Sequence, residues 1–277
     1  MKLITFGDSW MWGDELKPPT AEYRNSVNIG GLINKDYEFE SYINYANNGA
    51  SNERIILQIM EYKNSKYYDE NDFLVIGLSS LQRKLLYLNE SNTSFTIPTW
   101  DYDTHIDTTD SFLKNQDGFE SYMKGVLRFE VNDRNDLVRY NINLNALKSL
   151  LSSHKKYIVF QSIDNPKKMF DNIYNDKKDW IEIRLHHDYE ESTYDILSTR
   201  FFDKENLIKE LKRNLLDSQM WINLTEDSWL KYLWETCKSY HIGSHPTEIQ
   251  IRNWYHSVLK NHINKIGLPE NNKRTMI

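Results

Sequence analysis

Cysteine, which forms disulfide crosslinks, and glycine and proline, which favour turns, are scarce in this sequence. Its 277 residues include 10 glycines, 6 prolines and one cysteine, Cys237. A single cysteine excludes a disulfide within the chain, so a reducing compartment is tolerated. No apolar run approaches the roughly 20 residues that span a membrane, and the first residues lack the basic-then-apolar pattern of a signal peptide. We therefore expect a cytoplasmic protein with no membrane partner.

Positive charge is also in short supply. Lys and Arg total 34 against 40 Asp and Glu, which gives a formal net charge of −6 at pH 7. Because a protein that binds nucleic acid needs a basic face for the phosphates, this balance argues against a nucleic-acid partner. The hydrophobic fraction of 39% is sufficient for a core. The length suits one α/β domain with insertions, and we find no internal repeat and no clean linker, so residues 1–277 are expected to form a single domain.

Apolar, β-rich runs predict the strands. Residues 3–6, 38–45 and 73–77 read as strands separated by helical patterns, and this alternation implies right-handed crossovers and a parallel sheet. A fourth strand is expected at 157–160 and a short fifth strand at 218–224. The predicted fold is a three-layer, flavodoxin-like α/β/α domain with a mainly parallel sheet of about five strands.

Two segments, at about 86–133 and 165–218, interrupt this rhythm and are expected to be insertions that form a cap or rim. The first contains alternating Asp and His residues at 101–107, but Ile106 stands where a calcium loop would need glycine. The second contains adjacent histidines at 186–187, which would point in different directions. Solvated polar insertions are the preferred interpretation of both, so no metal is expected.

Small polar residues follow the predicted strands. Gly7-Asp8-Ser9 ends the first strand, Asn47–Ser51 with Gly49 follows the second, and Ser79-Ser80 follows the third. The carboxyl ends of parallel strands meet at one edge of a sheet, which is where α/β folds place their chemistry. We therefore expect Ser9, Gly49 and Ser79 to lie at the same edge.

A fourth segment, Gly243-Ser244-His245-Pro246, completes an ordered series near the carboxyl end of the chain. The series resembles the SGNH, or GDSL-type, hydrolase family, over roughly residues 1–85, 134–165 and 219–265. The resemblance implies a serine hydrolase in which Ser9 attacks an acyl carbonyl while His245 accepts and returns the proton.

The resemblance also implies an oxyanion hole. By this resemblance, the backbone N–H groups of Ser9 and Gly49 are two of the donors that bind the oxyanion. The family's third donor, an asparagine, is replaced here by Ser79, whose hydroxyl can donate one hydrogen bond. Arg83 follows on the same loop and either supplies positive charge to the site or forms a salt bridge on the surface. Asp8 is a further candidate for a supporting role.

The family's aspartate, three residues before its histidine, is absent because Ile242 occupies that position. Three alternatives follow. Ser9 and His245 act as a dyad, or an acid such as Asp164 arrives from elsewhere, or the site is degraded.

The activity expected from this series is ester hydrolysis without a cofactor. No extended aliphatic stretch suggests a lipid tunnel, so a small acyl group is favoured, such as acetyl on a sugar or another polar metabolite. Two alternatives stay open: an acyltransferase that uses the same site, and a binding or structural protein on a degenerate scaffold of this type.

Overall fold

The structure is a computed structural model that describes residues 1–88, 93–98, 118, 121–122, 125, 133–163, 220–222, 228–236 and 245–271. The predictions for Asp164, Cys237, Ile242, residues 101–107 and residues 186–187 lie outside these ranges. The described strands are β1 (Leu3–Phe6), β2 (Tyr42–Asn44), β3 (Phe73–Leu78), β4 (Arg83–Leu88), β5 (Thr93–Pro98) and β6 (Lys156–Gln161). The described helices are α1 (Ser9–Trp12), α2 (Ala21–Val27), α3 (Ile29–Asp36), α4 (Asn52–Lys63), α8 (Asp133–Leu151), α12 (Trp229–Thr236), α13 (Glu248–Trp254), the π-helical η1 (Tyr255–Leu259) and α14 (Lys260–Ile266).

The central sheet is parallel throughout its described strands, with the order β2-β1-β3-β6. This confirms the predicted parallel α/β architecture. Of the expected fifth strand at 218–224, the structure describes residues 220–222. They run beside β6, where Trp221 forms a parallel bridge to Val159 and the backbones of Met220 and Ile222 are hydrogen-bonded to Val159.

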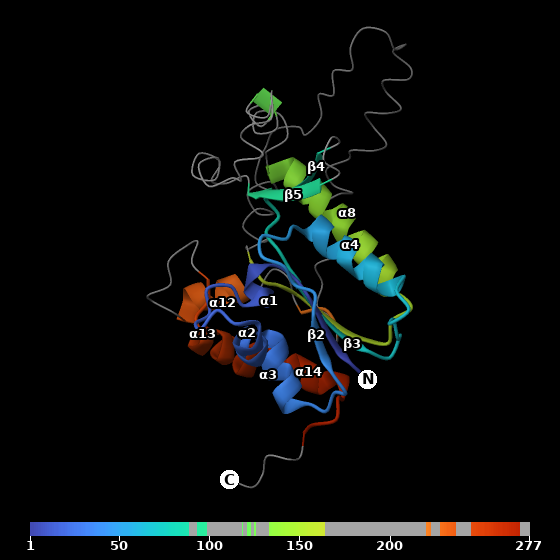
Figure 1. Cartoon of the computed structure of the whole chain (residues 1–277), viewed down its shortest axis with the longest axis vertical. Coiled ribbons are helices and arrows are strands. Elements are labelled where there is room, and N and C mark those ends of the chain that lie inside the picture. Colours follow the sequence, from blue (N-terminus) through green and yellow to red (C-terminus); the bar gives the residue numbers. More distant parts are fainter. Residues whose placement is uncertain are drawn as a thin grey trace.

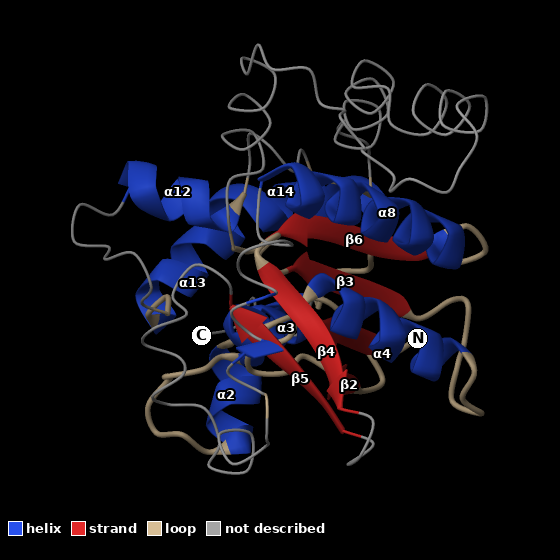
Figure 2. Cartoon of the chain, turned by 90° about the horizontal axis from the view of Figure 1, so that it is seen from above, coloured by secondary structure: helices blue, strands red, loops and turns tan. Residues whose placement is uncertain are grey.

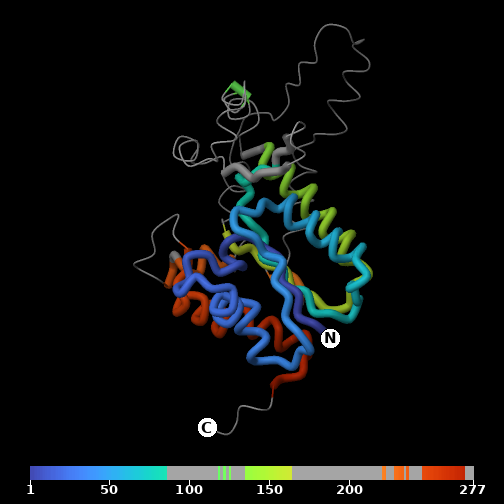
Figure 3. Tube along the Cα trace, viewed as in Figure 1, coloured from blue at the N-terminus to red at the C-terminus, as the bar shows by residue number. Residues whose placement is uncertain are grey.

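Strands β1 and β3 are buried along their whole length, and the period-2 alternation of the side chains in the central sheet divides the core in two. Leu3, Val75 and Phe160 belong to the cluster that contains residues of α3, α12, α13 and α14. Ile4, Ile76 and Val159 face the opposite way, into the cluster with residues of α4 and α8. Figure 1 shows these two helical layers on either side of the sheet, so the three-layer α/β/α arrangement is confirmed. In Figure 3 the carboxyl-terminal helices lie against the amino-terminal α2 and α3.

Between β1 and β2 the chain forms two successive helices, α2 and α3, that are divided at Asn28. Asn28 ends α2, and its side chain then accepts a hydrogen bond of 2.8 Å from the Gly31 N–H, which caps α3. An asparagine that bonds to the backbone in this way competes with continuation of the helix, and this explains the break.

A two-stranded hairpin opens the segment that the sequence marked as an insertion from residue 86. Strands β4 and β5 pair antiparallel, from Arg83 with Pro98 to Leu88 with Thr93, and Figure 2 shows the hairpin apart from the central sheet. This hairpin was not predicted from the sequence, although the β-branched and aromatic residues of 93–98 are typical of a strand. No helix of the described ranges is long and apolar enough to cross a membrane.

Candidate active site

Helix α1 positions Ser9 directly after β1. Asp8 caps the helix by accepting a hydrogen bond of 3.0 Å from the Trp10 N–H, so Ser9 is the first helical residue. Gly13, with φ 82°, ends the helix in the left-handed conformation. The Ser9 carbonyl then accepts hydrogen bonds from the N–H groups of Gly13, at 3.0 Å, and Asp14, at 2.9 Å. One tight loop therefore carries Ser9 and Asp14 together.

The Ser9 side chain is fully buried, and its Oγ has no hydrogen-bond partner among the described residues. The neighbouring Met11 fills the space beneath the strand ends, where a Cβ added to Gly77 would stand 2.5 Å from the Met11 Cγ. The absence of a side chain at Gly77 thus allows α1 to pack directly on β3.

Gly49 lies in the loop that follows β2. This loop is tied to the end of β1 by a hydrogen bond of 3.0 Å from the Asn47 N–H to the Gly7 carbonyl. Gly49 has φ 73°, a left-handed conformation that glycine adopts without strain. The structure therefore places Gly49 at the same edge of the sheet as Ser9.

Buried polar side chains fix the end of β3. Asn52 accepts a hydrogen bond of 2.8 Å from the Ser79 N–H and donates one of 3.1 Å to the Ser79 carbonyl. Gln161, at the end of β6, donates to the same carbonyl at 2.8 Å. Neither Asn52 nor Gln161 was predicted from the sequence as a site residue. The position of Asn52 directly after the helix-capping Ser51 was the only available signal.

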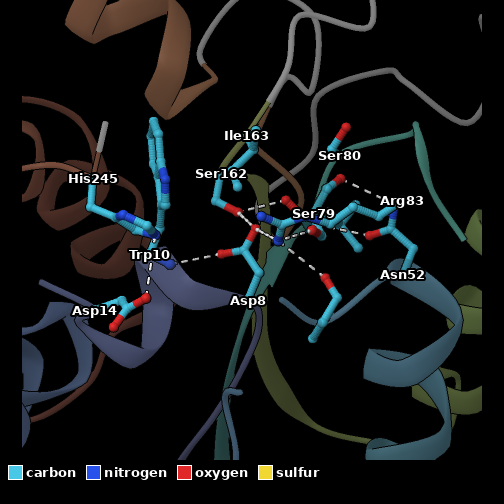
Figure 4. Close-up of polar contacts among 12 residues, drawn as sticks. Asp8, Trp10, Asp14, Asn52, Ser79, Ser80, Arg83, Ser162, Ile163 and His245 are labelled. Carbon is cyan, nitrogen blue, oxygen red and sulfur yellow. Dashed lines mark hydrogen bonds and ion pairs between the residues drawn. The ribbon is translucent and has the colours of Figure 1, made fainter. Parts of the chain in front are cut away.

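Arg83 connects the strand ends to one another (Figure 4). Its Nη1 lies 3.0 Å from the Ser79 Oγ, 3.4 Å from the Ala50 carbonyl oxygen and 3.6 Å from the Asp8 Oδ2. The Arg83 side chain is only 12% exposed, so of the two interpretations left open, a charge inside the polar cluster describes it and a surface salt bridge does not. The Ser162 Oγ lies 3.2 Å from the Asp8 Oδ2 and 2.6 Å from the Leu78 carbonyl oxygen, and its one hydroxyl proton can be donated to either acceptor.

Asp8 is the buried carboxyl of this cluster. Burial raises the pKa of Asp8 above its usual value, and the Arg83 charge together with hydrogen bonds from Ser79, the Trp10 N–H and Ser162 opposes that rise. The Ser79 Oγ accepts a hydrogen bond from the Arg83 Nη1 and keeps one proton of its own to donate, for which the Asp8 carboxylate is a nearby acceptor.

His245 lies beside the turn that follows α1. Its Nε2 is 3.7 Å from the Asp14 Oδ2 and its Nδ1 is 3.2 Å from the Glu15 Oε1, as the ring orientation in Figure 4 illustrates for Asp14. The Nδ1 atom is buried and makes no hydrogen bond to a described residue, Glu15 included. No hydrogen bond joins His245 to Ser9 in this structure. Thr247, the N-cap residue of α13, lies two residues after His245 and forms a capping box with Gln250, which fixes the start of the helix.

The two tryptophans beside the serine lie mainly in the core. Trp10 is 5% exposed and meets Trp229 edge to face, with ring centroids 5.2 Å apart. Trp12 is partly buried against the same core, with the Arg24 guanidinium 4.0 Å from the centroid of its ring. Within the described residues there is no group of three or more His, Cys, Asp or Glu side chains that could hold a metal.

The fold and the cluster define an open, parallel three-layer α/β protein with its buried polar residues at the carboxyl ends of the strands. The chain belongs to a family whose model is described as "Family of unknown function (DUF6071)" and matches residues 13–186. The matched span begins after Ser9 and ends before His245. No curated protein matches the chain.

Two solved structures are similar to the chain. One is a member of the lipolytic protein G-D-S-L family from Veillonella parvula, with 13% identity, a TM-score of 0.40, and coverage of 94% of this chain and 96% of that one. The other is the lipase Lip_vut3 from a goat rumen metagenome, with 9% identity, a TM-score of 0.41, and coverage of 97% and 98%. Because the identities and the TM-scores are both low, these two structures carry no argument about the roles of the site residues, which rest on the geometry of this chain.

Proposed function

We propose that this protein is a serine hydrolase of the SGNH type that cleaves an ester, with Ser9 as nucleophile and His245 as general base. The observation that carries the proposal is a pair of buried atoms without a hydrogen bond: the Ser9 Oγ, and the His245 Nδ1, which lies 3.2 Å from the Glu15 Oε1. Leaving such a group unsatisfied costs about 1–3 kcal/mol, so each needs an explanation. A hydroxyl donor and an imidazole acceptor would satisfy each other if the loop before α13 brought them together.

The proposed reaction has two stages. The Ser9 Oγ attacks the acyl carbonyl carbon while the His245 Nδ1 takes the hydroxyl proton, and the alcohol leaves with that proton. Water then attacks the acyl-enzyme, giving its proton to His245, and the ester bond to Ser9 breaks as the proton returns to the Ser9 Oγ. The backbone N–H of Ser9 belongs to the first turn of α1, where N–H groups lack helical partners, and would bind the oxyanion with that of Gly49.

Ser79 and Arg83 fit this proposal differently from the sequence-based expectation. Since the Arg83 guanidinium carries a full positive charge and contacts the Ser79 Oγ and the Ala50 carbonyl, we assign the third oxyanion contact to the Arg83 side chain. Asp8 holds Arg83 and caps the helix that begins with Ser9. The acyl group is proposed to be small, such as acetyl on a sugar or polar metabolite.

The test is intact mass after treatment with a fluorophosphonate, which reports an activated serine without knowledge of the substrate. The wild type is compared with Ser9→Ala and His245→Ala. Matched controls are Ser80→Ala, a buried serine at the same edge, and His256→Ala, an exposed histidine on η1. The expected result is one adduct in the wild type and both controls, no adduct in Ser9→Ala and slow labelling in His245→Ala.

A second candidate is a binding or structural protein on an inactive scaffold. The observation that favours it is the His245 ring, which faces two carboxylates and makes no hydrogen bond to Ser9. Complete absence of an adduct, under conditions that label a known serine hydrolase, would support this candidate and refute the proposed activity. If the adduct forms, release of the acyl group to water or to an added alcohol distinguishes a hydrolase from an acyltransferase.

A further inference from the structure

The position three residues before His245, where the family has an aspartate, is Ile242 in this sequence. An acid is nevertheless beside the histidine. The Asp14 Oδ2 lies 3.7 Å from the His245 Nε2, and the Asp14 N–H is bonded to the Ser9 carbonyl at 2.9 Å. The same short loop therefore holds the serine and a carboxylate that reaches the histidine ring.

We propose that Asp14 is the positioning acid of the site, in place of the aspartate missing before His245. This inference rests on the proposed serine-hydrolase function. Asp14 would hold the Nε2 nitrogen in its protonated state, which leaves the Nδ1 as the proton acceptor. The Nδ1 is the ring nitrogen that is buried without a hydrogen bond.

When the Nδ1 takes the proton of the Ser9 hydroxyl, the ring becomes an imidazolium whose Nε2 lies 3.7 Å from the Asp14 Oδ2. The charged ring exists only while it holds the transferred proton, in both stages of the reaction, so the attraction to Asp14 favours proton transfer more than ground-state binding. The distance of 3.7 Å is longer than a hydrogen bond, and such contacts often tighten only when substrate is bound.

Glu15 is the other acid beside the His245 ring, and it differs from Asp14 in how far its side chain is exposed. The Asp14 side chain is 23% exposed, whereas that of Glu15 is 65% exposed. Water and salt screen an exposed carboxylate, so its pairing is weak even though Glu15 lies nearer to the ring, at 3.2 Å. Glu15 is therefore the matched control for Asp14: it is adjacent in sequence, carries the same charge and contacts the same ring.

The experiment measures the second-order rate constant for fluorophosphonate labelling of Ser9 in the wild type, Asp14→Asn, Asp14→Glu and Glu15→Gln. Asp14→Asn is expected to label about 10- to 1,000-fold more slowly, less than the loss for a fully buried acid because Asp14 is partly exposed. Asp14→Glu restores a carboxylate and is expected to recover most of the rate. Glu15→Gln is expected to stay within about threefold of the wild type. Circular dichroism and thermal melting of each variant establish that it is folded.

The outcomes separate the two proposals. A wild type that labels normally and slows in His245→Ala, but is unaffected by Asp14→Asn, overturns the role of Asp14 and leaves the hydrolase proposal standing. Equal slowing in Asp14→Asn and Asp14→Glu indicates a structural role and also overturns it. A wild type that does not label overturns both. If Asp14→Asn does not fold, Asp14→Ser replaces it and is judged by the same comparison with Asp14→Glu.

Discussion

Replacement of Arg83 by methionine removes the guanidinium that neutralises Asp8 and retains an unbranched apolar stem. The Asp8 side chain is fully buried, that of Arg83 is 12% exposed, and the Nη1 and Oδ2 atoms are 3.6 Å apart. At that separation and an effective dielectric constant of about 20, the attraction is roughly 5 kcal/mol. Removing one partner of such a pair leaves a buried charge uncompensated, and we expect the free energy of unfolding to fall by about 3–5 kcal/mol at pH 7.

The pH dependence of this loss identifies its cause. Burial raises the pKa of Asp8 in the folded chain, so its protonated form is favoured by folding. The stability that Asp8 contributes is therefore fully present below its unfolded pKa, near 3.9, and is lost as the pH rises through the folded value. Without Arg83 the folded pKa rises further. The deficit of Arg83→Met should be largest at pH 7 and should shrink as the pH is lowered and Asp8 becomes protonated.

Urea denaturation of Arg83→Met, Asp8→Asn and the double variant at pH 7 and pH 5 measures these terms. Asparagine keeps the helix cap, so the double variant should be more stable than Arg83→Met alone. Lys155→Met is the control: Lys155 pairs with Glu70 at a shorter distance, 2.6 Å, but both side chains are about half exposed, and the expected loss is at most about 1 kcal/mol. A pH-independent loss in Arg83→Met, or equal losses in Arg83→Met and Lys155→Met, would refute the reasoning.

Two further predictions concern the titration of a buried histidine and the packing of α1 on β3. His154 is buried, with its Nε2 2.7 Å from the Asp72 carbonyl oxygen, and burial lowers its pKa. The unfolded chain therefore binds more protons below about pH 6.5, and the wild type should lose stability as the pH falls from 7 to 5, while His154→Gln should lose less, as thermal melting at each pH will report. Gly77→Ala places a Cβ 2.5 Å from the Met11 Cγ and should cost about 1–3 kcal/mol in urea denaturation, with a less-than-additive loss when combined with Met11→Ala.

The sheet was predictable from the sequence because its determinants are local. Short apolar runs such as Leu3–Phe6 and Phe73–Gly77 are long enough for a strand and too short for a helix, and both became buried parallel strands. The break at Asn28 was not predicted, since it depends on one side chain that caps the next helix rather than on a pattern.

The arrangement of the site was predictable only in part. That Ser9, Gly49 and Ser79 follow strands that pair side by side comes from the order of the strands along the chain. The roles of single side chains depend on register and direction. Leu78 pairs with Gln161, for example, and this register brings the Gln161 amide to the Ser79 carbonyl. Asp14 approaches His245 from the opposite end of the sequence, and no spacing rule connects them.

The hairpin of β4 and β5 has a consequence for how this protein tolerates changes of length. Arg83 pairs with Pro98 at the base of the hairpin, so the chain leaves the hairpin next to the point where it entered. Residues added or removed between Pro98 and Asp133 thus join two anchors, the end of β5 and the start of α8, without altering the strand that carries Arg83. The pairing of β4 with β5 therefore holds Arg83, and with it the charge next to Asp8, by contacts made within the hairpin.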